Sequence, residues 1–157
     1  MKPLELVDLL ASRFHGLVAK SSWGETALFY NPSQLLPSGV YVATVKEHDG
    51  DNDRASQLDR PGIYRFSVGI GNVAYGRRFG VKPARPLKGE VVATGHDFTA
   101  VDVVLPHPVY AWMGWISILS PSSESIRQLW PDIEVGYALA QKKYSSRRPK
   151  IKNQFTL

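Results

Sequence analysis

Residues 63–70 alternate between large apolar side chains and smaller or polar ones, and this pattern constrains the fold more than any other. The apolar set consists of Tyr64, Phe66, Val68 and Ile70. Side chains of a strand point alternately to opposite faces, so this segment is predicted to be a strand with one face in a hydrophobic core. The opposite set contains Arg65 with Ile63, Ser67 and Gly69. We therefore expect Arg65 either to reach solvent or to line a cleft.

Other short segments have the composition of strands and are bounded by glycine or proline. They cover residues 26–31, 39–47, 101–105 and 112–119. Helical spacing of apolar residues favours helices at residues 3–14 and 72–79, and from Ser120 onward with a restart at Pro131. Residues 48–57 and 81–99 have turn composition and should be loops, with at most one short strand near residues 90–93.

This order of elements predicts one α+β domain over residues 1–147, with an antiparallel sheet flanked by helices, followed by a basic tail at residues 148–157. At 157 residues, with 43% hydrophobic and 21% charged residues, the chain can bury a core of its own. The absence of cysteine excludes disulfides, a thiolate nucleophile and cysteine-ligated zinc. Glu5 and Asp8 interrupt the apolar run that a signal peptide needs, and no apolar stretch approaches the roughly 20 residues of a membrane span. We expect a cytoplasmic protein with no membrane partner.

Positive charge gathers near the end of the chain, where no acid follows Glu134. The six basic residues there are Lys142, Lys143, Arg147, Arg148, Lys150 and Lys152. Without these six, 13 Lys and Arg remain against 14 Asp and Glu, so the rest of the chain is close to neutral. This basic run predicts weak, salt-sensitive contact with nucleic acid. A solubilising tail without a partner is the alternative.

Two motifs resemble cofactor sites but fail in their details. Residues 69–74 read G-x-G-x-x-A, as in dinucleotide sites, but no clear strand follows that ends in an acid. Residues 49–53 begin like a calcium loop, but Arg54 and Arg60 occupy the positions that require glycine and glutamate. No two histidines have the spacing of a helical metal pair. We expect no cofactor and no metal.

The candidate ligand-binding residues come from two proline-containing segments. Asp59 and Arg60 begin a D-R-P-G turn before the strand that carries Arg65, and His107 lies between two prolines ahead of Tyr110. If both segments lie at one end of the sheet, these five residues would line one concavity for an anionic or planar ligand. The alternatives are an internal pair between Asp59 and an arginine, and a histidine that orders its loop by bonding a carbonyl.

Four stretches together resemble an uncharacterised family, a domain of unknown function common in actinobacteria. They are residues 58–69, with R-P-G-x-Y-R, residues 105–110, with P-H-P-V-Y, and residues 114–121 and 137–140. The order of elements is also similar to that of the MmcQ/YjbR-like domains, whose α+β fold is called double-wing. The resemblance implies the fold and implies no activity.

Two functions are compatible with these residues. The first is a non-enzymatic binding module for an anionic or aromatic small molecule, with nucleic acid as one candidate partner. The second is a small cofactor-independent enzyme in which His107 is the general acid or base and an arginine orients an anionic substrate. The sequence leaves open whether the protein is an enzyme.

Overall fold

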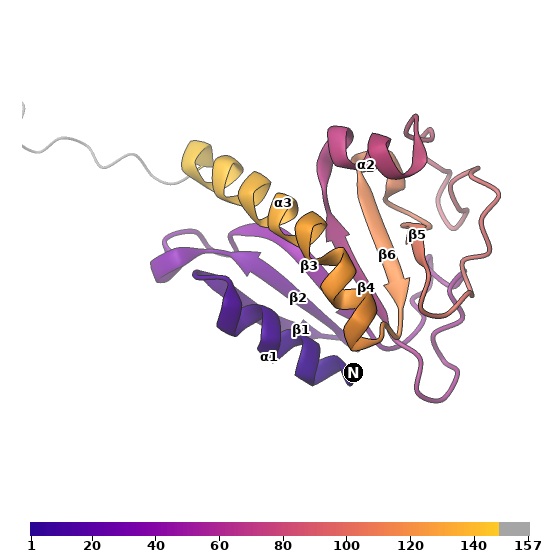
Figure 1. Ribbon diagram of the computed structural model, residues 1–157, viewed down its shortest axis with the longest axis horizontal. Helices are drawn as coiled ribbons and strands as arrows, with labels where there is room; N and C mark the ends of the chain where they lie inside the picture. The colour runs from indigo at the N-terminus through magenta and orange to yellow at the C-terminus, as the bar shows by residue number, and fades with distance from the viewer. Residues whose placement is uncertain (148–157) are drawn as a thin grey trace, which may run out of the picture.

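A six-stranded antiparallel sheet, with strand order β1-β2-β3-β4-β6-β5, forms the centre of this computed structural model, which describes residues 1–147. The strands are β1 (Leu17–Ser22), β2 (Glu25–Tyr30), β3 (Val40–Lys46), β4 (Arg65–Gly69), β5 (Val104–Pro106) and β6 (Trp115–Leu119). The helices are α1 (Pro3–Arg13), α2 (Gly71–Phe79) and α3 (Ser123–Arg147), with short 3₁₀ turns η1 (Pro32–Gln34) and η2 (Ala111–Met113). Helices α1 and α3 cover one face of the sheet, and α2 lies at one end of β4 and β6 (Figure 1). The predicted α+β class with an antiparallel sheet is confirmed.

The core lies between the sheet and the helices α1 and α3. Phe66 and Val68 of β4 are fully buried and stand opposite Val45 and Ala43 of β3. The whole predicted apolar set of residues 63–70 is buried in this core. The alternation therefore identified the correct core face of β4.

A β-bulge in β3 determines what the opposite face of the sheet carries. Phe29 of β2 stands opposite Tyr41, but Leu28 stands opposite Ala43, so Val42 is an extra residue without a partner on β2. Because of the bulge, Tyr41 lies on the same face of the sheet as Thr44 and Lys46. In a regular strand, Tyr41 and Thr44 would lie on opposite faces. The ring of Tyr41 packs on Phe29 there, with the ring centroids 4.3 Å apart.

Several predicted elements differ from the observed ones. Strand β1 was not predicted, because most of its residues are exposed at the edge of the sheet. Residues 90–93 form no strand, and the last strand begins only at Trp115, because residues 111–113 form η2. Helix α3 starts after Ser122, whose hydroxyl accepts the N–H of Ser125, rather than at Ser120.

Helix α3 also continues through Pro131 instead of restarting there. A proline inside a helix costs about 3 kcal/mol, because it removes a hydrogen bond and crowds the preceding turn. Leu129 before the proline and Ile133 after it are both buried in the core. Burial of this shared stripe offsets the cost, so the two predicted helices are one.

The three helices within residues 1–147 are too short or too polar to cross a bilayer. The predicted basic tail, residues 148–157, lies outside the residues that the structure describes.

Replacing Phe66 with Ala should lower the free energy of unfolding by about 3–5 kcal/mol, because it leaves a cavity in a fully buried site. Urea denaturation followed by circular dichroism would measure the loss. Leu35→Ala is the matched control, since Leu35 is exposed and its truncation should cost less than about 0.5 kcal/mol. Equal losses in the two variants would contradict the core position of Phe66.

Candidate functional site

An open cleft of about 500 Å³ lies on the sheet face that α1 and α3 leave uncovered. Its floor consists of sheet residues, chiefly Thr44, Lys46 and Arg65. The loop between β3 and β4 forms one wall and contributes Asp53. Residues 107–113, which follow β5, form the other wall.

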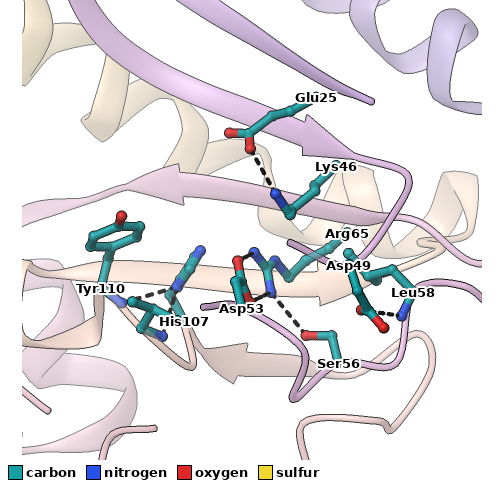
Figure 2. A network of polar contacts seen from close by, with 10 residues as sticks. Glu25, Lys46, Asp49, Asp53, Ser56, Leu58, Arg65, His107 and Tyr110 are labelled. Carbon is teal, nitrogen blue, oxygen red and sulfur yellow. Dashed lines mark hydrogen bonds and ion pairs between the residues drawn. The ribbon is translucent and has the colours of Figure 1, made fainter. Parts of the chain in front are cut away.

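Arg65 is buried at the bottom of the cleft and pairs with Asp53. Its Nη1 donates to Asp53 Oδ1 at 2.9 Å and to Ser56 Oγ at 3.0 Å, and its Nη2 donates to Asp53 Oδ2. Arg65 is only 2% exposed, so this two-pronged pair is shielded from water. Burial alone would raise the pKa of Asp53, but the hydrogen bond and charge of Arg65 outweigh it and lower that pKa. The pair fastens the loop between β3 and β4 onto the sheet (Figure 2).

His107 orders its own turn by hydrogen bonds. It does so as an acceptor, whereas the sequence alternative expected it to donate to a backbone carbonyl. Its Nδ1 accepts the backbone N–H groups of Val109 and Tyr110, both at 3.0 Å. Because two donors point at Nδ1, the proton of the neutral ring resides on Nε2. Nε2 has no acceptor within residues 1–147, and Figure 2 places it on the far side of the ring from these two donors.

The surroundings keep His107 neutral. Burial, and then the nearby charge of Arg65, lower the pKa of His107 well below its usual value, and Asp53 only partly opposes them. The imidazole is therefore uncharged at neutral pH. It presents one fixed N–H donor in the cleft, as a neutral histidine does when it polarises a carbonyl.

Lys46 and Glu25 form the second ion pair of the cleft. They are partners in the β2–β3 register, and Lys46 Nζ lies 3.2 Å from Glu25 Oε2. The lysine side chain is 14% exposed and the glutamate 35%, so this pair is more open to water than the pair below it. With Arg65 and Asp53, the cleft holds two positive and two negative side chains, and its charges balance.

Exposed aromatic side chains form the upper part of the cleft. Tyr41 on β3 is 57% exposed and Tyr110 is 47% exposed. Trp115 lines the cleft as well, and the ring centroids of His107 and Tyr110 are 5.1 Å apart. The cleft therefore combines a charged but balanced floor with ring faces that are open to solvent.

Three of the five predicted ligand-binding residues line this cleft, namely Arg65, His107 and Tyr110, and two do not. Arg60 donates to the carbonyls of Gln57, Ser56 and Thr99 at 2.8–3.1 Å, so it fixes loops. Asp59 lies beside it in a separate hollow near the N-terminus, where its carboxylate accepts the N–H of Asp49. The predicted shared concavity is wrong for these two residues, and the arginine of the cleft pairs with Asp53 instead of Asp59.

Five residues of the cleft were not among the predicted ligand-binding residues: Glu25, Tyr41, Lys46, Asp53 and Trp115. Asp53 was visible only as part of a failed calcium motif. Within residues 1–147, no three potential ligands among His, Asp and Glu gather to hold a metal ion. Of the predicted nucleic-acid contacts, Lys142, Lys143 and Arg147 lie in α3, whereas Arg148, Lys150 and Lys152 lie outside the described residues.

Replacing Asp53 with Asn should lower the free energy of unfolding by about 3–5 kcal/mol at pH 7, because the buried charge of Arg65 would lose its partner. Glu25→Gln breaks the more exposed pair and should cost at most about 1 kcal/mol. Urea denaturation of both variants would compare the costs. A small loss for Asp53→Asn would show that the buried pair does not fasten the loop.

Acid should destabilise the protein through His107. Its pKa is lowered on folding, so the unfolded chain takes up a proton near pH 6.5 that the folded chain refuses. The stability contributed by the neutral ring is therefore present above pH 6.5 and is lost as the pH falls below it. Between pH 7.5 and 5.5 the wild type should lose more free energy of unfolding than His107→Gln, which has no such group, and the difference can reach at most about 1.4 kcal/mol. Equal pH dependence in urea denaturation would contradict a neutral, buried His107.

Comparison with curated proteins finds no match, and comparison with solved structures finds none either. The likeness to MmcQ/YjbR-like double-wing domains therefore stays a prediction from the sequence. A protein-family model, in contrast, matches residues 1–149, nearly the whole chain. The chain belongs to DUF6194, a family of unknown function.

Proposed function

We propose that this domain is a non-enzymatic binding module that takes a planar ligand into the cleft. The ring of the ligand would stack on the exposed face of Tyr41 or Tyr110. A hydrogen-bond acceptor on its edge would face His107 Nε2–H and Lys46 Nζ. The observation that carries the proposal is His107, whose Nδ1 is occupied by two backbone donors while its Nε2–H has no partner in the described chain.

The size and composition of the cleft support a small ligand. A volume of about 500 Å³ lies within the range of small-molecule sites, which combine apolar or aromatic walls with a few directed polar groups. The ligand would be largely uncharged where it enters the cleft, because Lys46 and Arg65 are already paired with carboxylates. Of the two expected ligand types, the aromatic one therefore fits the cleft better than the anionic one.

The arrangement favours binding over catalysis by His107. A general base needs a free lone pair, but Nε2 carries a proton and Nδ1 already accepts two hydrogen bonds. A general acid needs a charged imidazolium near neutral pH, and the lowered pKa of His107 opposes that state. The same features suit a permanent hydrogen-bond donor.

A matched pair of variants tests this role. In His107→Asn, the amide oxygen can replace Nδ1 as the acceptor of the turn, but nothing replaces the donor Nε2–H. In His107→Gln, the longer amide can replace the donor Nε2–H, but nothing replaces the acceptor Nδ1. Adenine, uracil and indole would serve as planar probes, with binding measured by ligand-observed NMR and by tryptophan fluorescence. The Asn variant should keep its melting temperature but bind adenine or uracil at least about tenfold more weakly, the effect of one lost hydrogen bond.

Tyr41→Ala should weaken all three probes, because it removes a stacking surface without touching the polar floor. Indole has no acceptor on its edge, so its affinity should be the same in the wild type and in His107→Asn. If no probe binds the wild type, or if the Asn variant binds adenine and uracil as the wild type does, the proposed role of the cleft is wrong.

A further inference from the structure

Residues 77–88, here called the basic segment, form a positively charged surface on the folded part of the chain. It runs from the last turn of α2 into the loop toward β5 and contains Arg77, Arg78, Lys82, Arg85 and Lys88. No acid occurs between Asp59 and Glu90. Four of the five basic residues are exposed, and within residues 1–147 only Arg78 makes an ion pair, with Asp132. The charges are therefore available to an outside partner.

The basic segment reaches the rim of the cleft. The guanidinium of Arg85 lies over the ring of Trp112, 4.9 Å from its centroid, and the next residue, Met113, lines the cleft. The loop then passes along the cleft wall, because the N–H of Val92 donates to the carbonyl of Pro108 at 2.9 Å. Figure 1 shows this loop beside β5 and β6. Cationic side chains thus continue outward from a cleft whose own charges balance.

The spacing of the charges suits a linear polyanion. Three of the intervening residues are Gly80, Pro83 and Pro86, which keep the loop out of helical conformation, so the charges spread along it. A chain of this kind extends up to about 3.3 Å per residue, so one compact phosphate would meet only one or two of these side chains. A polymer with regularly spaced phosphates can meet several at once.

We propose that the basic segment and the cleft together bind single-stranded nucleic acid, with one base in the cleft and the phosphates along the basic segment. The part of this proposal that concerns the base rests on the proposed function of the cleft. Exposed rings and a fixed donor can read a base only when it is unpaired and unstacked, as in a single strand. Glu90 borders a smaller hollow beyond Lys88, where Asp51 is already paired with Arg54, and Glu90 would repel phosphates there, so the path of the backbone ends at that point.

The test measures binding of the full-length protein to a labelled twelve-nucleotide single strand and to the matching duplex at two salt concentrations. Replacing Arg77, Arg85 and Lys88 by Gln removes three exposed charges. This triple replacement should weaken single-strand binding at least tenfold. It should also make the slope of log K against log salt concentration less negative by about 2, because three phosphate contacts are lost. The matched control replaces Lys2, Arg13 and Arg127 by Gln, three exposed residues outside the cleft and the basic segment, and its affinity should stay within about threefold of the wild type.

His107→Asn tests the binding of a base in the cleft separately from the binding of phosphates along the basic segment. It should weaken single-strand binding and leave the salt dependence unchanged, because no phosphate contact is lost. If it impairs adenine or uracil binding but not single-strand binding, the cleft binds a planar ligand and the nucleic-acid proposal is wrong. If it impairs neither, the proposed function of the cleft fails as well.

Two further results would overturn the proposal. One is a duplex that binds as tightly as the single strand, since a paired base cannot enter the cleft. The other is a loss of binding that follows only the replacement of Arg148, Lys150 and Lys152 by Gln, which would move the contact to the end of the chain.

Discussion

The buried pair between Arg65 and Asp53 is the interaction on which the rest of the cleft depends. It joins a central strand to a loop that contains no helix or strand, and together with the hydrogen bonds of Arg60 it holds one wall of the site in place. The charge of Arg65 also helps to lower the pKa of His107 and thereby keeps that ring neutral. A buried charge is costly unless it is paired, so moving the loop away from the sheet would leave Arg65 unpaired and destabilise the folded state. The stability of the loop and the chemistry of the cleft thus share one cause.

The second constraint is the bulge at Val42, because it decides which side chains of β3 face the cleft. With the extra residue, Tyr41 joins Thr44 and Lys46 on the uncovered face, while the apolar residues of the strand stay in the core. One strand can therefore present an aromatic ring and a lysine to the same site. Bulges are common next to functional sites for this reason, since they turn a side chain without breaking the sheet.

The two faces of the sheet consequently have different tasks. The helix-covered face supplies the hydrophobic core, whereas the other face carries paired charges and exposed rings under two loops. The chain without its basic C-terminal run is close to neutral, but its charges are separated locally. The charges of the cleft balance one another, whereas the rim of the cleft is positive. Average charge describes solubility and long-range attraction, but the position of each charge determines what kind of molecule fits.

The sequence by itself determined the class of fold, the core face of β4, the position of Arg65 on the opposite face and the first helix. These features follow from local periodicity, which reports which side chains must be buried. Only the tertiary structure decided that Arg65 pairs with Asp53 rather than Asp59, and that Pro131 lies within one continuous helix. It also decided that His107 accepts rather than donates at Nδ1, and that Tyr41 and Lys46 share a face. Each of these depends on strand register, on the path of a loop or on burial against distant residues, and no local pattern encodes such long-range geometry.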